Sequence, residues 1–111
     1  MRWTKEQLAI HQRRTSSAPV TVEKDLHADI IAELKARRIY FSHSQMHKAH
    51  TNGIGTPDFI IAMPGGRTLW CEIKTAKGKL TREQSGVAML LKIANHEHHV
   101  VRSLNEFLEI L

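Results

Sequence analysis

Two short motifs, each beside a run of strand-forming residues, most constrain what this chain can fold into. Pro57-Asp58 precedes the apolar run 59–63, and Glu72-Ile73-Lys74 lies inside the run 68–75. Charged side chains are costly within apolar strands unless they are paired or bind a metal ion. Two carboxylates and a lysine on neighbouring strands therefore indicate a divalent-metal site.

The turn between the two runs decides whether the charges can meet. Pro64-Gly65-Gly66-Arg67 predicts an antiparallel hairpin, with Asp58 at the start of one strand and Glu72 late on the other. Side chains alternate between the faces of a strand, so Glu72 and Lys74 share a face. The alternative is a solvated Glu72–Lys74 ion pair on an edge strand. Gly53 and Gly55 are expected to let the backbone pass close to a ligand.

The rest of the chain predicts a mixed α/β fold. Leu26, Ile30, Ile31 and Leu34 recur at helical spacing, and Thr81 with Gln84 forms a capping box at a helix start. We expect, in chain order, a helix over 21–38, strands over 39–41, 58–63 and 68–75, a helix over 81–95, a strand over 98–102, and a short helix opened by a second capping box, Ser103 with Glu106. A strand–helix–strand connection within one sheet implies a parallel crossover.

Length and composition limit the classes of protein. A chain of 111 residues forms one domain, which we place at 21–111 behind an N-terminal arm over 1–20 that includes a short helix capped by Thr4. The single cysteine excludes an intramolecular disulfide framework and a cysteine-based zinc site. The chain has no apolar run of bilayer length and no secretory signal, so we expect a cytoplasmic protein without a membrane partner.

The charge balance indicates an anionic partner. The formal net charge is +5 and the sequence pI about 9.7, a balance for which nucleic acid is the commonest partner. Phosphate contacts are predicted for four basic residues near the carboxylate motifs, Arg67, Lys77, Lys79 and Arg82; an ordinary solvated loop is the alternative. The segment 43–52 is rich in histidine and is predicted to be a loop, with zinc binding as a minor interpretation.

The motifs suit phosphodiester hydrolysis. A divalent metal can neutralise phosphate charge, activate water and stabilise the leaving oxygen. Magnesium favours one or two carboxylates plus retained waters, a need that Asp58 and Glu72 meet, with the Ile73 carbonyl as a further candidate ligand. Lys74 would position the attacking water or stabilise the transition state. It would act as a general base only if its pKa were lowered.

These residues resemble a known family. Gly55-Thr56-Pro57-Asp58, then Glu72-Ile73-Lys74, then the segment Lys77-Gly78-Lys79-Leu80-Thr81-Arg82-Glu83-Gln84 are similar to the VRR-NUC branch of the PD-(D/E)XK nucleases. The resemblance covers roughly residues 23–102. The histidine content of 43–52 and the arm before Thr21 depart from the family pattern.

The resemblance implies a restriction-endonuclease-like core: a helix, a three-stranded antiparallel meander, a helix and a parallel fourth strand. It further implies a Mg²⁺- or Mn²⁺-dependent DNA endonuclease of bacterial or phage origin that acts as a homodimer on branched or junction DNA in repair. Carried over by position, Asp58 and Glu72 are metal ligands and Lys74 is the catalytic lysine. Gln84 matches the glutamine on the following helix, and Glu23 more loosely matches an extra acidic ligand.

Some of these residues also have purely structural interpretations. Glu23 is also typical of the first turn of a helix, and Gln84 of a capping box. Two other functions use the same fold: a non-catalytic nucleic-acid-binding module, and a partner-dependent subunit of a phage or mobile-element replication complex that binds through its arm.

Overall fold

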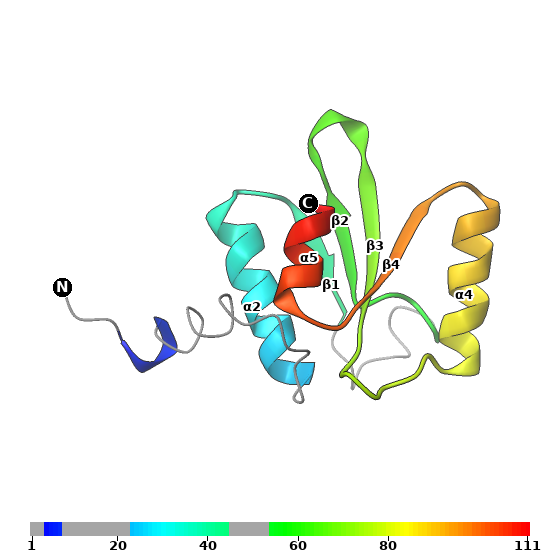
Figure 1. Cartoon of the computed structure of the whole chain (residues 1–111). Helices are drawn as coiled ribbons and strands as arrows, with labels where there is room; N and C mark the ends of the chain where they lie inside the picture. The colour runs from blue at the N-terminus through cyan, green and yellow to red at the C-terminus, as the bar shows by residue number, and fades with distance from the viewer. Residues whose placement is uncertain (1–3, 8–22, 45–53) are drawn as a thin grey trace.

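A mixed four-stranded sheet organises the computed structural model, which describes residues 4–7, 23–44 and 54–111 (Figure 1). Its strands follow one another in the order β1-β2-β3-β4. The elements, in chain order, are α2 (Glu23–Ala36), β1 (Phe41–His43), β2 (Phe59–Ala62), the 3-10 turn η2 (Pro64–Gly66), β3 (Thr68–Ile73), α4 (Arg82–Ile93), β4 (Glu97–Val101) and α5 (Leu104–Ile110).

The pairing of the strands confirms the predicted topology. β1 with β2 and β2 with β3 are antiparallel, whereas β3 with β4 is parallel. Phe59 lies opposite Cys71 in the central hairpin, and Ile73 lies opposite Val101 in the parallel pair. The architecture is the expected helix, antiparallel meander, helix and parallel fourth strand.

The hydrophobic core lies on one face of this sheet. Alternation along β3 turns Leu69, Cys71 and Ile73 to that face, where all three are fully buried. The α2 stripe of Leu26, Ile30 and Leu34 covers it, and Phe107 of α5 completes the layer. The predicted α2 stripe is therefore core packing, with Ile31 only partly buried at its margin.

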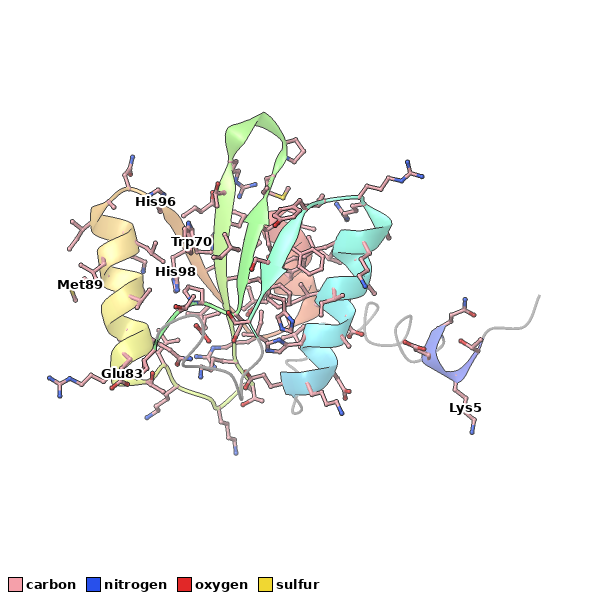
Figure 2. All side chains as sticks on the ribbon, turned by 180° about the vertical axis from the view of Figure 1, so that it is seen from behind. Lys5, Trp70, Glu83, Met89, His96 and His98 are labelled. Atoms are coloured by element: carbon pink, nitrogen blue, oxygen red, sulfur yellow. The ribbon has the colours of Figure 1, made fainter. Side chains whose placement is uncertain are left out.

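Helix α4 lies on the other side of β4 and buries far fewer of its side chains than α2 does (Figure 1). Of its side chains, only Ala88 is buried. Trp70 and His98 are paired across β3 and β4, and Figure 2 shows both on the side of the sheet that α4 approaches. Met89 points away from the sheet into solvent.

The first strand begins later than the sequence pattern predicts. Arg38 has a positive φ of 57°, and the Ile39 amide donates to the Leu34 carbonyl, closing a Schellman motif after α2. Ile39 and Tyr40 therefore belong to the helix exit and its connection, and β1 runs from Phe41 to His43. The expectation of a strand over 39–41 is wrong by two residues, and His43 is a strand residue instead of a loop residue.

The helix caps agree with the sequence in most respects. Thr81 accepts from the Gln84 amide and Gln84 bonds back to the Thr81 amide, which confirms the capping box of α4. Thr4 and Gln7 form the same arrangement. At α5 the Ser103 hydroxyl caps the helix, but the Glu106 carboxylate accepts from the Arg102 amide instead of the Ser103 amide. That second capping box is therefore only half formed.

Other predictions lie outside the described residues. Most of the arm over 1–20, the Thr21 cap and positions 45–52 of the histidine-rich segment belong to this group. Within the described part of the chain, none of the helices combines the length and apolar character needed to cross a membrane.

Candidate metal centre

Most of the candidate site residues predicted from the sequence motifs lie at one end of the sheet. β2 begins there and β3 ends there, and the first turns of α2 and α4 lie at the same end (Figure 1). Helix N-termini carry a partial positive charge, so this end favours carboxylates and other anions. The hairpin, and not the order of the residues in the chain, brings the two motifs together.

Asp58 lies one position before β2, directly opposite Glu72 in the continued register from Phe59 and Cys71. Its Oδ2 accepts a hydrogen bond of 2.8 Å from the Ile73 amide. The residue is only 8% exposed. The Asp58 side chain therefore continues the hydrogen bonding between β2 and β3 beyond the start of β2, with the Ile73 backbone amide as its donor.

Glu72 is the most deeply buried acid of the site, with 2% of its surface exposed. Burial, followed by the charge of Asp58 and a hydrogen bond with it, raises the pKa of Glu72 to about 9, against a weaker opposing effect of Lys74. Two carboxyl groups held this close cannot both ionise cheaply without a cation. The pair is therefore poised for a positive ligand.

Gln84 links the site to α4, because it closes the predicted capping box and its side chain also reaches Glu72. Its Oε1 accepts from the Thr81 amide at 2.8 Å, and its Nε2 donates to Glu72 Oε1 at 2.8 Å. The capping box fixes the amide group, because the oxygen is engaged by the backbone and only the nitrogen remains free to reach Glu72. The cap thus orients a carboxylate oxygen of the site.

Gly55 places the loop before Asp58 against α4. Its φ is +88°, and a Cβ at this position would lie 2.5 Å from the Glu83 carbonyl oxygen. We expected the glycines of this loop to make room for a ligand. At Gly55 the backbone passes close to the first turn of α4, and its approach to a ligand stays a prediction; Gly53 lies outside the described residues.

Glu23 and His27 complete the cluster from α2. One ligand atom from each of Glu23, His27 and Asp58 lies within 4.8 Å of the others. His27 Nε2 is 3.5 Å from Glu23 Oε1 and 3.8 Å from Asp58 Oδ2. The structure therefore brings Glu23, the loosest of the sequence candidates, to the same site as Asp58.

His27 is the residue that sequence reasoning missed. It follows Glu23 by four positions, so the two side chains share one helix face, and this spacing is the signal that would have found it. Its Nδ1 lies 2.7 Å from Nε2 of His43, whose ring stacks on Phe59. Burial and the neighbouring His27 lower the pKa of His43.

Lys74 and the basic loop follow β3 at the same end of the sheet. The Lys74 amide donates to the Val101 carbonyl, which holds this residue in line with β3. Arg102 holds the loop by donating to the carbonyls of Thr75 and Gly78 at 2.6 and 2.7 Å. Lys77, Lys79 and Arg82 extend from this anchored segment and its junction with α4, and all three are exposed.

Arg67 lies elsewhere. It follows η2 at the opposite end of the hairpin and donates to the Glu97 carboxylate and the Ile110 carbonyl. Hydrogen bonds from Arg67 and then His99 lower the pKa of Glu97 to about 2. The structure therefore does not bring Arg67 to the carboxylates and gives it a bonding role between the hairpin, β4 and α5.

The donor set fits a divalent cation. Asp58 and Glu23 offer carboxylate oxygens beside His27 Nε2, a buried nitrogen with no hydrogen-bond partner in the structure, and Glu72 is hydrogen-bonded to Asp58. Carboxylates are the ligands that Mg²⁺ and Mn²⁺ use in proteins. A small cation would remove the repulsion between the buried carboxylates.

Comparison with known proteins supports the architecture. No family model and no curated protein matches the sequence. A solved structure described as a VRR_NUC domain matches this one with a TM-score of 0.63 and 16% sequence identity, covering 76% of this chain and 87% of that chain. The chain has the fold of a VRR_NUC domain. The resemblance read from the motifs and the likeness of the folds thus agree.

The tight contact at Gly55 gives the first prediction. Gly55→Ala lowers the free energy of unfolding by on the order of 3 kcal/mol, because a left-handed alanine is strained and its Cβ meets the Glu83 carbonyl. Gly65→Ala is the matched control, since Gly65 has φ +81° and open space around it; about 1–2 kcal/mol is expected there. Urea denaturation measures both. Equal losses would contradict the contact with α4.

The buried carboxyl pair gives a pH dependence. In metal-free protein, folded Glu72 holds its proton up to about pH 9, whereas its ordinary pKa is 4.5. The folded state therefore binds more protons between these values, and the unfolding free energy falls as pH rises through this window.

Glu72→Gln removes this dependence. We expect the free energy of unfolding of the variant to exceed that of wild type by about 1 kcal/mol or more at pH 8, and the two values to approach each other near pH 4.5. Urea denaturation in EDTA from pH 4.5 to 9 measures the difference. Glu109→Gln, an exposed acid on α5, is expected to keep the wild-type slope. If the unfolding free energy of Glu72→Gln falls with pH as steeply as that of wild type, Glu72 is ionised in the folded protein and the prediction is wrong.

Proposed function

We propose that this protein is a divalent-metal-dependent DNA endonuclease that hydrolyses phosphodiester bonds. The observation that carries the proposal is the convergence of Asp58, Glu72 and Gln84 at one end of the sheet, with Lys74 directly after β3. The likeness of the fold to a VRR_NUC domain supports the proposal, because the sequence motifs independently resemble the same family. The proposal therefore rests on the arrangement of these particular side chains as well as on the likeness of the fold.

The metal would be Mg²⁺ or Mn²⁺, held by Asp58 and Glu72 with the Ile73 carbonyl and Glu23 as further ligands. Such an ion supplies a Lewis acid for the phosphate and lowers the pKa of a water molecule. Glu72 is kept in place by Gln84, and Asp58 by the Ile73 amide. These hydrogen bonds fix the orientation of both carboxyl groups beside one another.

Lys74 is assigned to the reaction itself. It shares the Glu72 face of β3, and its charge acts on Glu72. There it would orient the attacking water and stabilise the negative charge that develops on the phosphate. Gln84 acts by positioning Glu72.

The substrate is DNA, held through its phosphates. Lys77, Lys79 and Arg82 lie on the segment that leads from β3 to α4, and Arg102 fixes the carbonyls of that segment. Phosphate contacts of this kind give an affinity that does not depend on the base sequence and that falls as the salt concentration rises. Arg67 is left out of this surface because it bonds Glu97 and Ile110.

We expect branched DNA, such as a four-way junction, to be the preferred substrate, cut by a homodimer with one site for each of two strands, in phage or bacterial repair. The exposed apolar face of α4 supports the dimer. Met89, Leu90 and Ile93 stand at helical spacing and are exposed, Leu90 by 67%. With Leu80 and Ala88, Met89 and Ile93 also line a hollow of about 370 Å³. A second copy of the chain would cover this surface.

Cleavage assays test the function. Purified protein with Mg²⁺ or Mn²⁺ is expected to cut labelled four-way junction faster than flap, duplex or single-stranded DNA. Asp58→Ala and Lys74→Ala are each expected to lower the rate at least about 100-fold, because they remove a metal ligand and the charge beside the phosphate. Arg67→Ala is the matched control, a basic residue on the same hairpin, and is expected to cut like wild type.

Cleavage that survives both site variants would assign the activity to another site or a contaminant. Binding of DNA without cleavage by wild type would favour a non-catalytic binding module. Cleavage that appears only after a partner protein is added would favour the partner-dependent subunit.

The assembly has its own test. Leu90→Glu is expected to convert a dimer into a monomer in sedimentation-velocity measurements, because it puts a charge into the apolar face. Tyr40→Glu is the control, since Tyr40 is 78% exposed on a different part of the molecule, and it is expected to remain dimeric. A monomeric wild type at micromolar concentration would contradict the dimer.

A further inference from the structure

His27 has a feature that its neighbours on α2 do not explain. The residue is only 7% exposed, yet its Nε2 atom has no hydrogen-bond partner. A buried polar atom without a partner costs free energy comparable to a lost hydrogen bond. The ring is aimed at two acids, Glu23 and Asp58, at distances too long for hydrogen bonds.

These distances suit three ligands around one ion. Zinc-class and magnesium-class ions hold nitrogen and oxygen at about 2.0–2.2 Å, so two ligands of one ion lie at most roughly 4.2 Å apart. His27 Nε2 is 3.5 Å from Glu23 Oε1 and 3.8 Å from Asp58 Oδ2. Both pairs meet this limit, and all three ligand atoms lie within 4.8 Å of one another, so small side-chain movements suffice to place them around one ion.

His43 orients the imidazole from the other side. Its Nε2 lies 2.7 Å from His27 Nδ1, and its ring stacks on Phe59, which is fully buried. When His27 donates its Nδ1 proton to His43, its Nε2 presents a lone pair to the carboxylates. Metal-bound histidines in proteins almost always give their second ring nitrogen such a partner.

We propose that His27 is a metal ligand, and that Glu23, His27 and Asp58 form a mixed nitrogen–oxygen site selective for first-row transition ions over Mg²⁺ and Ca²⁺. An imidazole nitrogen suits transition ions, whereas Mg²⁺ and Ca²⁺ take oxygen ligands. The inference rests on the proposed function for the role of the metal, and adds to it the ligand that decides which metal binds.

The competing explanation is an imidazolium that merely neutralises the two acids. A protonated His27 would have hydrogens on both ring nitrogens and could not ligate a metal. The two explanations differ in a direct observable, the presence of an imidazole nitrogen bound to the ion. Mn²⁺ is a suitable probe because it is paramagnetic and belongs to the transition series.

Pulsed EPR of the full chain loaded with Mn²⁺ provides the test. We expect the wild type to show a directly coordinated ¹⁴N, replaced by the ¹⁵N pattern when the protein is made with [¹⁵N]histidine. Calorimetric titration should show Mn²⁺ binding at least about tenfold tighter than Mg²⁺. Because the wild-type spectrum needs no variant, it decides the assignment even if a variant fails to fold.

His27→Gln supplies the second measurement. The amide oxygen replaces a nitrogen ligand, so the variant is expected to lose the nitrogen coupling and at least about tenfold in Mn²⁺ affinity, with less than about threefold change for Mg²⁺. His96→Gln is the control, since His96 is exposed in the turn after α4 and should leave both values unchanged. Thermal unfolding followed by circular dichroism confirms that each variant is folded.

The outcomes separate this inference from the proposed function. Bound Mn²⁺ without nitrogen coupling, or coupling that persists in folded His27→Gln, overturns the His27 assignment alone. Nitrogen coupling in a protein that cuts no DNA supports the assignment and overturns the nuclease. Absence of binding of either ion at millimolar concentration overturns both.

Discussion

The approach of two buried carboxyl groups, Asp58 and Glu72, is the interaction on which the rest of this structure depends. They face each other across the open end of the β2–β3 hairpin, where the Ile73 amide holds one and the Gln84 amide group holds the other. Packing alone does not favour such a pair, because burial and mutual repulsion both disfavour its charged form. The pair makes physical sense as a site for a cation.

The fold supplies this site with support from separate parts of the chain. The capping box of α4 directs Gln84 at Glu72, and the left-handed Gly55 presses the loop before Asp58 against the same helix turn. From the opposite side, α2 brings Glu23 and His27 with its first turns. Arg102 fastens the basic loop that follows β3. The supports from α4 are a hydrogen bond and a close backbone contact at its first turn, so they do not rely on the rest of that helix, where only Ala88 is buried.

Much of this followed from local patterns. The helical stripe of α2, the Pro-Gly-Gly turn and the Thr81–Gln84 cap are short-range signals, and the structure confirms the elements they predict. The strand limits were less accurate. Ile39 and Tyr40 look like strand residues, but the Schellman motif at Arg38 delays the strand, and Arg38 is an unusual residue for a left-handed position. Arg67 is near the carboxylates in sequence, yet the four strand residues between it and Glu72 carry it to the far end of the sheet.

The sequence by itself determined the order of the elements, the hairpin and the shared face of Glu72 and Lys74. These properties depend on a period of two along a strand and on turn chemistry, which are local. Only the tertiary structure decided that Glu23 joins Asp58, that Gly55 touches α4, and that His27 and His43 stand behind the acids. Those contacts join residues separated by up to 35 positions, and their closeness depends on how α2 crosses the sheet, which no local pattern specifies.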